Sequence, residues 1–197
     1  STENLLQLFK LGNEGIIIEE CLFGTEVSVL AFCNGKEALL MPQAQDYKNI
    51  YDGDSGPNTG GMGAICPANI LTESEIILVK CHMDKVVKKL EYKGVLYSGL
   101  MKTENGIFFL EFNCRFGDPE AQVILNLLDN NAPSGRLTNI IDTCIQGKNI
   151  DIKWKTNKSA AVVVLSHVDY PTKKMEQAVK ITYNDTLDSS VKIYESN

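Results

Sequence analysis

The sequence predicts an α+β fold in which a largely antiparallel sheet packs against helices. Two Asn-Gly pairs, at 34–35 and 105–106, each lie between apolar, β-branched runs. Asn and Gly accept the positive φ angles of tight hairpin turns, so both pairs indicate antiparallel strands. A separate segment after Thr72 has the apolar spacing of an amphipathic helix. Hairpins and separate helices in one chain are typical of the α+β class.

The first half of the chain divides at glycines. Residues 5–11 are predicted to end a short helix at Gly12, and the β-branched run 15–20 to form a strand. Residues 27–33 and 38–41 form the first hairpin. Thr72 and Glu75 have capping-box spacing, and the helix that follows places apolar side chains at helical intervals through Leu90.

The second half begins with strands 95–103 and 107–113. Asp118-Pro119 is predicted to cap and open a helix that runs through residue 128. Another helix spans residues 137–145 and stops at Gly147. Residues 153–158 are interpreted as a linker, and residues 159–168 as a new strand.

Composition limits the possible functions. A chain of 197 residues with 44% hydrophobic and 22% charged residues is ordinary for one globular domain or part of two. Its net charge of -6 argues against binding nucleic acid or an anionic membrane surface. The chain has neither an apolar run of about 18 residues nor a signal-like start, so the cytosol is the expected compartment. Six scattered cysteines without a C-x-x-C pair predict reduced thiols.

The segment 111–120 carries the strongest chemical signal. Alternate residues of a strand share a face, so Glu111 and Asn113 present two oxygen ligands to one volume. Mg²⁺ takes one or two such protein ligands and completes its shell with water and substrate phosphates. Arg115 follows as a planar fork for phosphate or carboxylate.

Residues 52–63 form the second candidate, a loop with five of the fifteen glycines. Glycine lets backbone N–H groups approach an anion closely, but a flexible surface loop explains the same composition. The loop lacks the glycine of a trypsin-like nucleophile segment and the final Glu of a calcium loop. No P-loop or Rossmann glycine pattern is complete anywhere in the chain.

Residues 19–26 form the third candidate. Glu19 ends the predicted strand, and Glu26 follows an extended apolar link. Backbone groups of the link would meet the adenine edge, while Glu26 would accept hydrogen bonds from two ribose hydroxyls. A solvated strand end is the alternative.

In this order and spacing, residues 19–26, 45–48, 56–64 and 111–120 resemble the ATP-grasp domain of the phosphoribosylamine-glycine ligase (glycinamide ribonucleotide synthetase) family. The resemblance covers residues 5–130 and implies that ATP, glycine and 5-phosphoribosylamine give glycinamide ribonucleotide, ADP and phosphate through a glycyl phosphate, in purine biosynthesis. It implies ATP and Mg²⁺ or Mn²⁺ as cofactors, no nucleic acid or membrane partner, and membership of a multifunctional purine enzyme as one possibility.

The resemblance also assigns residues. Metal would bind Glu111 and Asn113, and adenosine would bind Glu19, the backbone at Leu22, and Glu26. Catalytic roles would fall to Arg115, Lys48 and Asp46. The substrates or phosphates would be faced by Asn58, Thr59, Gly60, Gly61, Met62, Gly63 and Asp118.

The family's chains are longer, so residues 1–158 are interpreted as the second half of the ATP-grasp domain and residues 159–197 as the beginning of a C-terminal domain. The chain would then supply one wall of the active site. A nucleotide-binding module or fragment without turnover is the alternative function.

Overall fold

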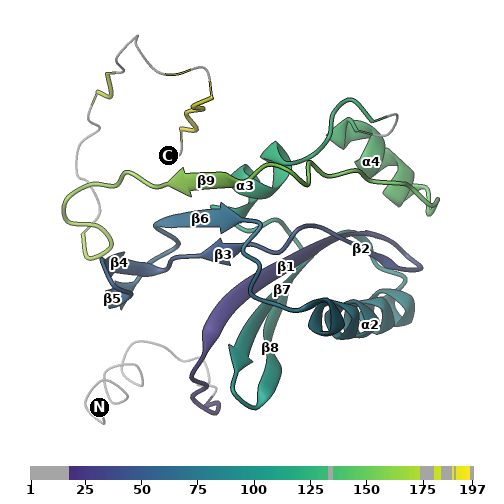
Figure 1. Ribbon diagram of the computed structural model, residues 1–197, viewed down its shortest axis with the longest axis horizontal. Helices are drawn as coiled ribbons and strands as arrows, with labels where there is room; N and C mark the ends of the chain where they lie inside the picture. The colour runs from purple at the N-terminus through teal and green to yellow at the C-terminus, as the bar shows by residue number, and fades with distance from the viewer. Residues whose placement is uncertain (1–17, 133–134, 174–179, 183–187, 189, 196–197) are drawn as a thin grey trace, which may run out of the picture. The chain divides into compact units, whose positions relative to one another are not determined.

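The computed structural model describes residues 18–132, 135–173, 180–182, 188 and 190–195. The chain divides into two compact units, the first ending at Val164 and the second beginning at Leu165. The first unit contains all the helices and strands of the described residues (Figure 1). None of these helices has the length and apolar character needed to cross a lipid bilayer.

The largest sheet in the described chain has four antiparallel strands in the order β2-β1-β7-β8. Both predicted hairpins are present, since β1 (Thr25–Asn34) turns into β2 (Ala38–Leu40) and β7 (Lys93–Thr103) turns into β8 (Gly106–Asn113). Gly35 and Gly106 have φ angles of +87° and +124°, which a residue without Cβ adopts readily. The Asn-Gly signal therefore identified both turns correctly.

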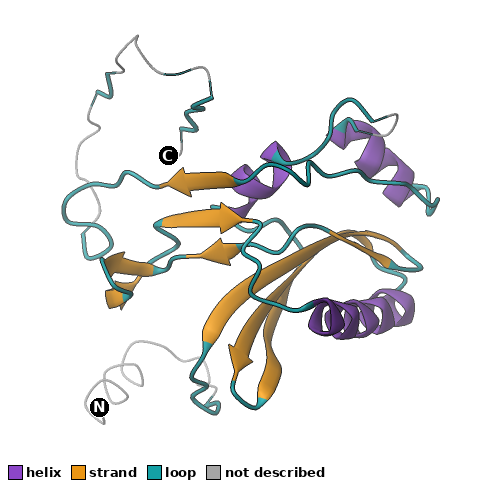
Figure 2. Cartoon of the chain, in the orientation of Figure 1, coloured by secondary structure: helices purple, strands orange, loops and turns teal. Residues whose placement is uncertain are grey.

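Strand β1 lies between β2 and β7 and is buried on both faces of the sheet. Its alternate residues pack in two directions, as the period of two in a strand requires. One set meets helix α2 (Glu73–Leu90), while the other faces α3 (Glu120–Asn126) and α4 (Leu137–Ile145) (Figure 2). The set toward α2 is Val27, Val29, Ala31 and Cys33, and the opposite set includes Leu30 and Phe32.

Two smaller sheets complete the first unit. Strand β6 (Gly63–Cys66) lies between β3 (Gln45–Asp46) and β9 (Ala160–Val163), with antiparallel pairing on both sides. Strands β4 (Asn49–Tyr51) and β5 (Ser55–Asn58) form a separate hairpin. The predicted glycine loop therefore contains β5 and ends where β6 begins.

The end of the first unit differs from the sequence-based interpretation. Residues 153–158 are not a free linker, because Trp154 forms a β-bridge with Leu128 and packs against the core. Strand β9 is shorter than the predicted strand 159–168, and its pairing with β6 places it in the first unit. The division falls between Val164 and Leu165, whereas the sequence placed a domain boundary between residues 158 and 159.

Two further predictions need correction. Residues 18–20 form no strand, while residues 15–17 and the predicted helix at 5–11 lie outside the described residues. Helix α3 ends at Asn126, and Asp118 does not cap it. Pro119 occupies the N-cap position, and its side chain has no group that can accept a hydrogen bond. The Asp118 carboxylate accepts from Gln122 Nε2 at 2.7 Å.

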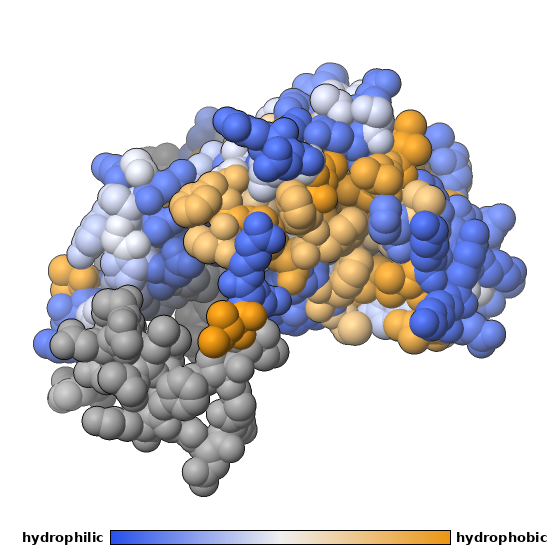
Figure 3. Space-filling model, turned by 90° about the horizontal axis from the view of Figure 1, so that it is seen from below, coloured by the Kyte–Doolittle hydropathy of each residue, from blue (hydrophilic) through white to orange (hydrophobic). Residues whose placement is uncertain are grey.

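Strand β8 lies at an outer edge of its sheet and keeps large apolar side chains in solvent. Phe108, Leu110 and Phe112 are 37%, 40% and 41% exposed. Seen from the side on which β8 and α2 lie in Figure 1, the surface shows a broad apolar area (Figure 3). This edge borders the cavity described next.

Candidate functional site

A cavity of about 250 Å³ opens beside β1, β7 and β8. Residues of β1 and β7 line it together with charged residues from separate parts of the chain. It is smaller than the roughly 300–1,000 Å³ of most small-molecule sites. It is lined by Glu19, Glu26, Val27, Ser28, Asp46, Lys48, Tyr97, Gly99, Leu100, Leu110 and Glu111.

Five predicted site residues meet at this cavity although the sequence separates them widely. They are Glu19 and Glu26 near the start of β1, Asp46 and Lys48 at and after β3, and Glu111 on β8. Long-range strand pairing brings them together, because β1 pairs with β7 and β7 with β8. The tertiary structure therefore forms one site from three sequence segments.

Glu111 and Asn113 face the same volume, as predicted for a metal pair. Asn113 Nδ2 donates a hydrogen bond of 3.0 Å to Glu111 Oε1. Gly99 lies opposite Glu111 in the β7–β8 pairing, and a Cβ there would stand 3.3 Å from Glu111 Cγ. The carboxylate and amide oxygens fit Mg²⁺ or Mn²⁺ in kind. Within the described chain no group of three or more His, Cys, Asp or Glu side chains is arranged to hold a metal ion, so such an ion would also need water or phosphate ligands.

A β-bulge explains how neighbouring residues of β8 share the cavity. The β7–β8 register shifts between Gly99 and Leu100, so Leu110 has no residue opposite it. Successive residues of a regular strand point to opposite faces. The extra residue changes the direction of the side chains that follow it, so that both Leu110 and Glu111 line the cavity. The cavity therefore has an apolar and a charged side chain next to each other.

Lys48 and Glu26 form an ion pair at one side of the cavity, with Lys48 Nζ 2.6 Å from Glu26 Oε2. Burial alone would lower the pKa of Lys48. The hydrogen bond and charge of Glu26, with the charges of Asp46 and Glu111, raise it overall. Lys48 is therefore a firmly charged group among carboxylates, and a bound phosphate would compete with Glu26 for it.

Asp46 has the most perturbed carboxyl of the cavity. Burial raises the pKa of Asp46 from its ordinary 3.8 to about 7, and the charge of Glu120 adds to the rise. Lys48 opposes it. The Oδ1 atom of Asp46 is buried without a hydrogen-bond partner. Such a group gains from a proton or an incoming cation, which is typical of functional sites.

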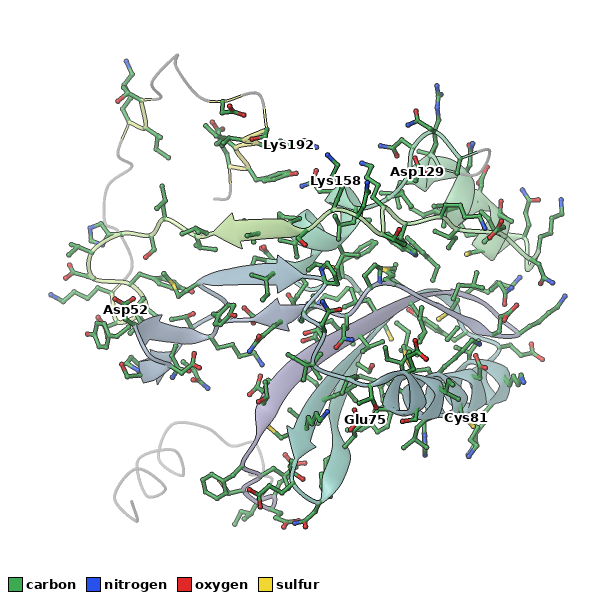
Figure 4. The ribbon with its side chains drawn as sticks, in the orientation of Figure 1. Asp52, Glu75, Cys81, Asp129, Lys158 and Lys192 are labelled. Carbon is green, nitrogen blue, oxygen red and sulfur yellow. The ribbon has the colours of Figure 1, made fainter. Side chains whose placement is uncertain are left out.

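The glycine loop folds back over the residues that follow β3. Thr59 N and Met62 N donate to the carbonyls of Lys48 and Tyr47, both at 2.7 Å, and Gly61 N donates to Thr59 Oγ1. These three N–H groups are satisfied within the protein, which does not support a phosphate nest built from them. Asp52 lies at the far tip of the β4–β5 hairpin (Figure 4).

Gly61 is the loop residue closest to the cavity chemistry. A Cβ on Gly61 would stand 2.9 Å from Asp46 Oδ1 and 2.5 Å from Pro119 Cδ. Gly61 does not line the cavity, and neither do the other loop residues predicted for substrate. They are Asn58, Thr59, Gly60, Met62 and Gly63.

Four other predicted residues also lie outside the cavity lining, and Asn113, next to Glu111 on β8, is one of them. Arg115 is exposed, and its Nη1 donates to the carbonyl of Phe116 at 2.9 Å. Asp118 is exposed and bonded to Gln122. Leu22 lies half-buried in the segment before β1.

Sequence reasoning missed three buried polar residues, two of which line the cavity. Ser28, Tyr97 and Glu120 are 3%, 6% and 2% exposed, and they are hydrogen-bonded to one another through Ser28. Ser28 and Tyr97 occupy interior strand positions where no local pattern distinguishes them. Glu120 is the last residue of the segment 111–120. Its position directly after Asp118-Pro119 is the one sequence signal that could have identified it.

Comparison with known proteins shows which family the chain belongs to. Residues 2–121 match the family described as "Phosphoribosylglycinamide synthetase, ATP-grasp (A) domain". A phosphoribosylamine–glycine ligase from a Nostoc species is 46% identical over 168 residues, which are 80% of this chain and 38% of the relative. The trifunctional purine biosynthetic protein adenosine-3 of Drosophila melanogaster is 43% identical over 181 residues, which are 87% of this chain and 13% of the relative.

A solved structure shows the same fold. The crystal structure of phosphoribosylamine–glycine ligase from Thermotoga maritima superposes with a TM-score of 0.67 and 35% identity, covering 78% of this chain and 39% of that one. The present chain spans less than half the length of each of these relatives. The predicted α+β, ATP-grasp fold is confirmed, and the chain belongs to the phosphoribosylglycinamide synthetase ATP-grasp domain family.

Proposed function

We propose that this chain forms the ATP- and metal-binding wall of a phosphoribosylamine–glycine ligase. The reaction joins glycine to 5-phosphoribosylamine and gives glycinamide ribonucleotide, ADP and phosphate. The observation that carries the proposal is the convergence of Glu19, Glu26, Asp46, Lys48 and Glu111 at one cavity. A cavity of about 250 Å³ is too small to enclose a nucleotide, which supports a role as one wall.

The charges around the cavity suggest a division of roles. Glu111 and Asn113 would hold Mg²⁺ or Mn²⁺, which neutralises phosphate charge during phosphoryl transfer. Adenosine would lie toward Glu19, Leu22 and Glu26.

Lys48 would contact phosphate, and Asp46 would face the attacking or accepting group. The glycine loop, Arg115 and Asp118 lie outside the cavity lining, so they would reach the substrates only after a rearrangement.

We also propose how this chain is placed in a larger protein. Residues up to Val164 would belong to the ATP-grasp domain, and Leu165 would begin the next unit. Relatives that carry the name of a trifunctional purine biosynthetic protein support fusion to other activities. All six cysteines are free thiols, which fits a reducing cytosol.

Calorimetric titration of ATP, with and without Mg²⁺, tests the metal assignment directly. Glu111→Gln should weaken Mg²⁺-dependent binding by about tenfold or more, since contacts to a charged group contribute about 1.5–3 kcal/mol. Glu104→Gln is the matched control, because Glu104 lies exposed in the turn between β7 and β8. Equal affinity of the Glu111→Gln variant and the control would refute the metal role.

Turnover is measured separately as ADP release that requires both glycine and 5-phosphoribosylamine. Release that needs both substrates supports ligase activity in this chain. Nucleotide binding without release would show that the chain alone acts as a binding module.

A further inference from the structure

Three buried polar side chains from different elements form one hydrogen-bonded row, and two of them, Ser28 and Tyr97, line the cavity. Ser28 Oγ donates to Glu120 Oε1 at 2.9 Å, and Tyr97 Oη lies 2.9 Å from Ser28 Oγ. A serine hydroxyl has a single proton. Because Ser28 gives that proton to Glu120, Tyr97 must donate to Ser28. The row therefore runs from the β7 tyrosine through β1 to the first residue of α3.

Stability alone does not explain the buried carboxylate. Glu120 is 2% exposed, and none of the salt bridges of the described residues involves it. A buried charge without an ionic partner costs free energy that an apolar side chain would avoid. Gly117 also makes room for it, since a Cβ there would stand 2.3 Å from Glu120 Oε2. The Gly117–Glu120 turn is thus shaped around this carboxylate.

The row connects the two sides of the cavity. Ser28 exchanges both backbone hydrogen bonds with Ala44, at 2.8 and 2.9 Å, just before Asp46 on β3. Tyr97 lies directly opposite Asn113 in the β7–β8 pairing. Movement of Ser28 or Tyr97 would therefore displace the acidic group on one side and the proposed metal pair on the other.

We propose that Glu120 is a positioning residue of this site, which through Ser28 and Tyr97 fixes the strands that carry Asp46 and the Glu111–Asn113 pair. This role rests on the proposed nucleotide function, and it assigns Glu120 no contact with substrate. Partners outside the ligand shell set the geometry of binding groups, and their loss commonly costs about 10–100-fold in affinity or activity.

Because Glu120 is charged, its effect on the titration of Asp46 can be measured, and a merely structural role would leave that titration unchanged. Asp46 is influenced by Glu120 from α3, Glu26 from β1 and Lys48 from the segment after β3. After burial, Glu120 is the largest cause of the raised pKa of Asp46. Removing that charge while keeping the hydrogen bond should lower the pH at which Asp46 titrates.

The test uses Glu120→Gln in the full 197-residue chain, because glutamine retains an oxygen that can accept from Ser28. Affinity for Mg²⁺-ATP should fall about tenfold. The Asp46 carboxyl, followed by ¹³C NMR, should titrate at lower pH than in the wild type. Glu75→Gln is the control, since it removes a carboxylate that stabilises α2 away from the cavity and should change neither quantity.

The outcomes separate this proposal from the proposed function. Reduced thermal stability with unchanged Mg²⁺-ATP affinity and unchanged Asp46 titration would overturn the positioning role. If the wild type binds no nucleotide, the function proposal fails, and the Asp46 titration alone decides whether Glu120 acts on the site. If Glu120→Gln does not fold, Ser28→Ala removes the same hydrogen bond. Wild-type affinity for Mg²⁺-ATP in Ser28→Ala would then refute the proposal.

Discussion

At the scale of single residues, the site is governed by the balance of one lysine among several carboxylates. Lys48 is paired with Glu26, and Asp46 retains a raised pKa despite the nearby ammonium. The Lys48–Glu26 pair is more than one third exposed on each side, so it contributes little to stability. The pair matters for binding, because a bound phosphate would compete with Glu26 for Lys48.

Substitution of Asp46 should change how stability depends on pH. The folded pKa is about 7 against an ordinary 3.8, so the folded state retains a proton that the unfolded state loses. The resulting stability is fully present below about pH 4 and is lost as pH rises through about 7. Asp46→Asn should remove this decline, measured by thermal unfolding from pH 5 to 8. Asp52→Asn, at the exposed tip of the β4–β5 hairpin, is the control, and parallel curves for Asp46→Asn and wild type would contradict the assignment.

Replacement of Lys48 should separate phosphate binding from adenosine binding. Lys48→Met should weaken ATP binding about tenfold, because a charged hydrogen bond contributes about 1.5–3 kcal/mol. Adenosine affinity should stay unchanged or rise, since Glu26 loses its partner and can accept from the ribose. Titration calorimetry with both ligands measures this, with the exposed Lys36→Met as control. Equal losses for ATP and adenosine would indicate a structural lysine instead.

At the scale of elements, capping residues determine where helix α2 begins. Helix α2 starts with a complete capping box, in which Thr72 accepts from Glu75 N and Glu75 accepts from Thr72 N. Glu75 also accepts from Lys102 Nζ at 2.9 Å, which joins α2 to β7 (Figure 4). The hydrogen bond from Thr72 and then that from Lys102 lower the pKa of Glu75 to about 2. The stability it contributes is present above its ordinary 4.5 and is lost as pH falls toward 2.

Removal of the cap should destabilise the protein without altering the cavity. Thr72→Ala should reduce the free energy of unfolding by about 1 kcal/mol, the usual cost of a lost N-cap. Urea denaturation measures this, and Thr156→Ala, an exposed threonine outside the helices, should change stability by less than about 0.5 kcal/mol. Nucleotide affinity should be equal in both variants. An unchanged free energy of unfolding in Thr72→Ala would show that packing alone stabilises the N-terminal end of α2.

At the scale of the whole molecule, the first unit is closed by a strand that arrives late in the sequence. Strand β9 pairs with β6, and Ala160 and Val162 pack against the core that also contains α3 and α4. Trp154 joins the same core just before β9. Residues 153–164 are therefore integral to the unit that carries the cavity.

Two truncations test this closure. A chain ending at Lys158 lacks β9, leaves β6 without that partner and exposes apolar core surface, which should cost about 2 kcal/mol or more. A chain ending at Val164 keeps β9 and should unfold at the denaturant midpoint of the full chain's first unit. Urea unfolding followed by Trp154 fluorescence compares the two, and equal midpoints would mean that β9 adds nothing to the unit.

Local sequence by itself determined much of this protein. The Asn-Gly turns and the capping box depend on neighbours in the chain, and the structure has both where they were predicted. The Glu111 and Asn113 side chains also lie together, joined by a hydrogen bond. These features follow from backbone conformation and strand period, which short segments encode directly. The family resemblance extended the prediction to the ATP-grasp fold.

Only the tertiary structure decided how those parts meet. The bulge that turns Leu110 and Glu111 to one cavity, the pairing of β9 with β6, and the Ser28–Glu120 hydrogen bond depend on residues far apart in sequence. The physical reason is that a buried polar group takes the partner that the folded chain offers it, and no local pattern specifies that partner.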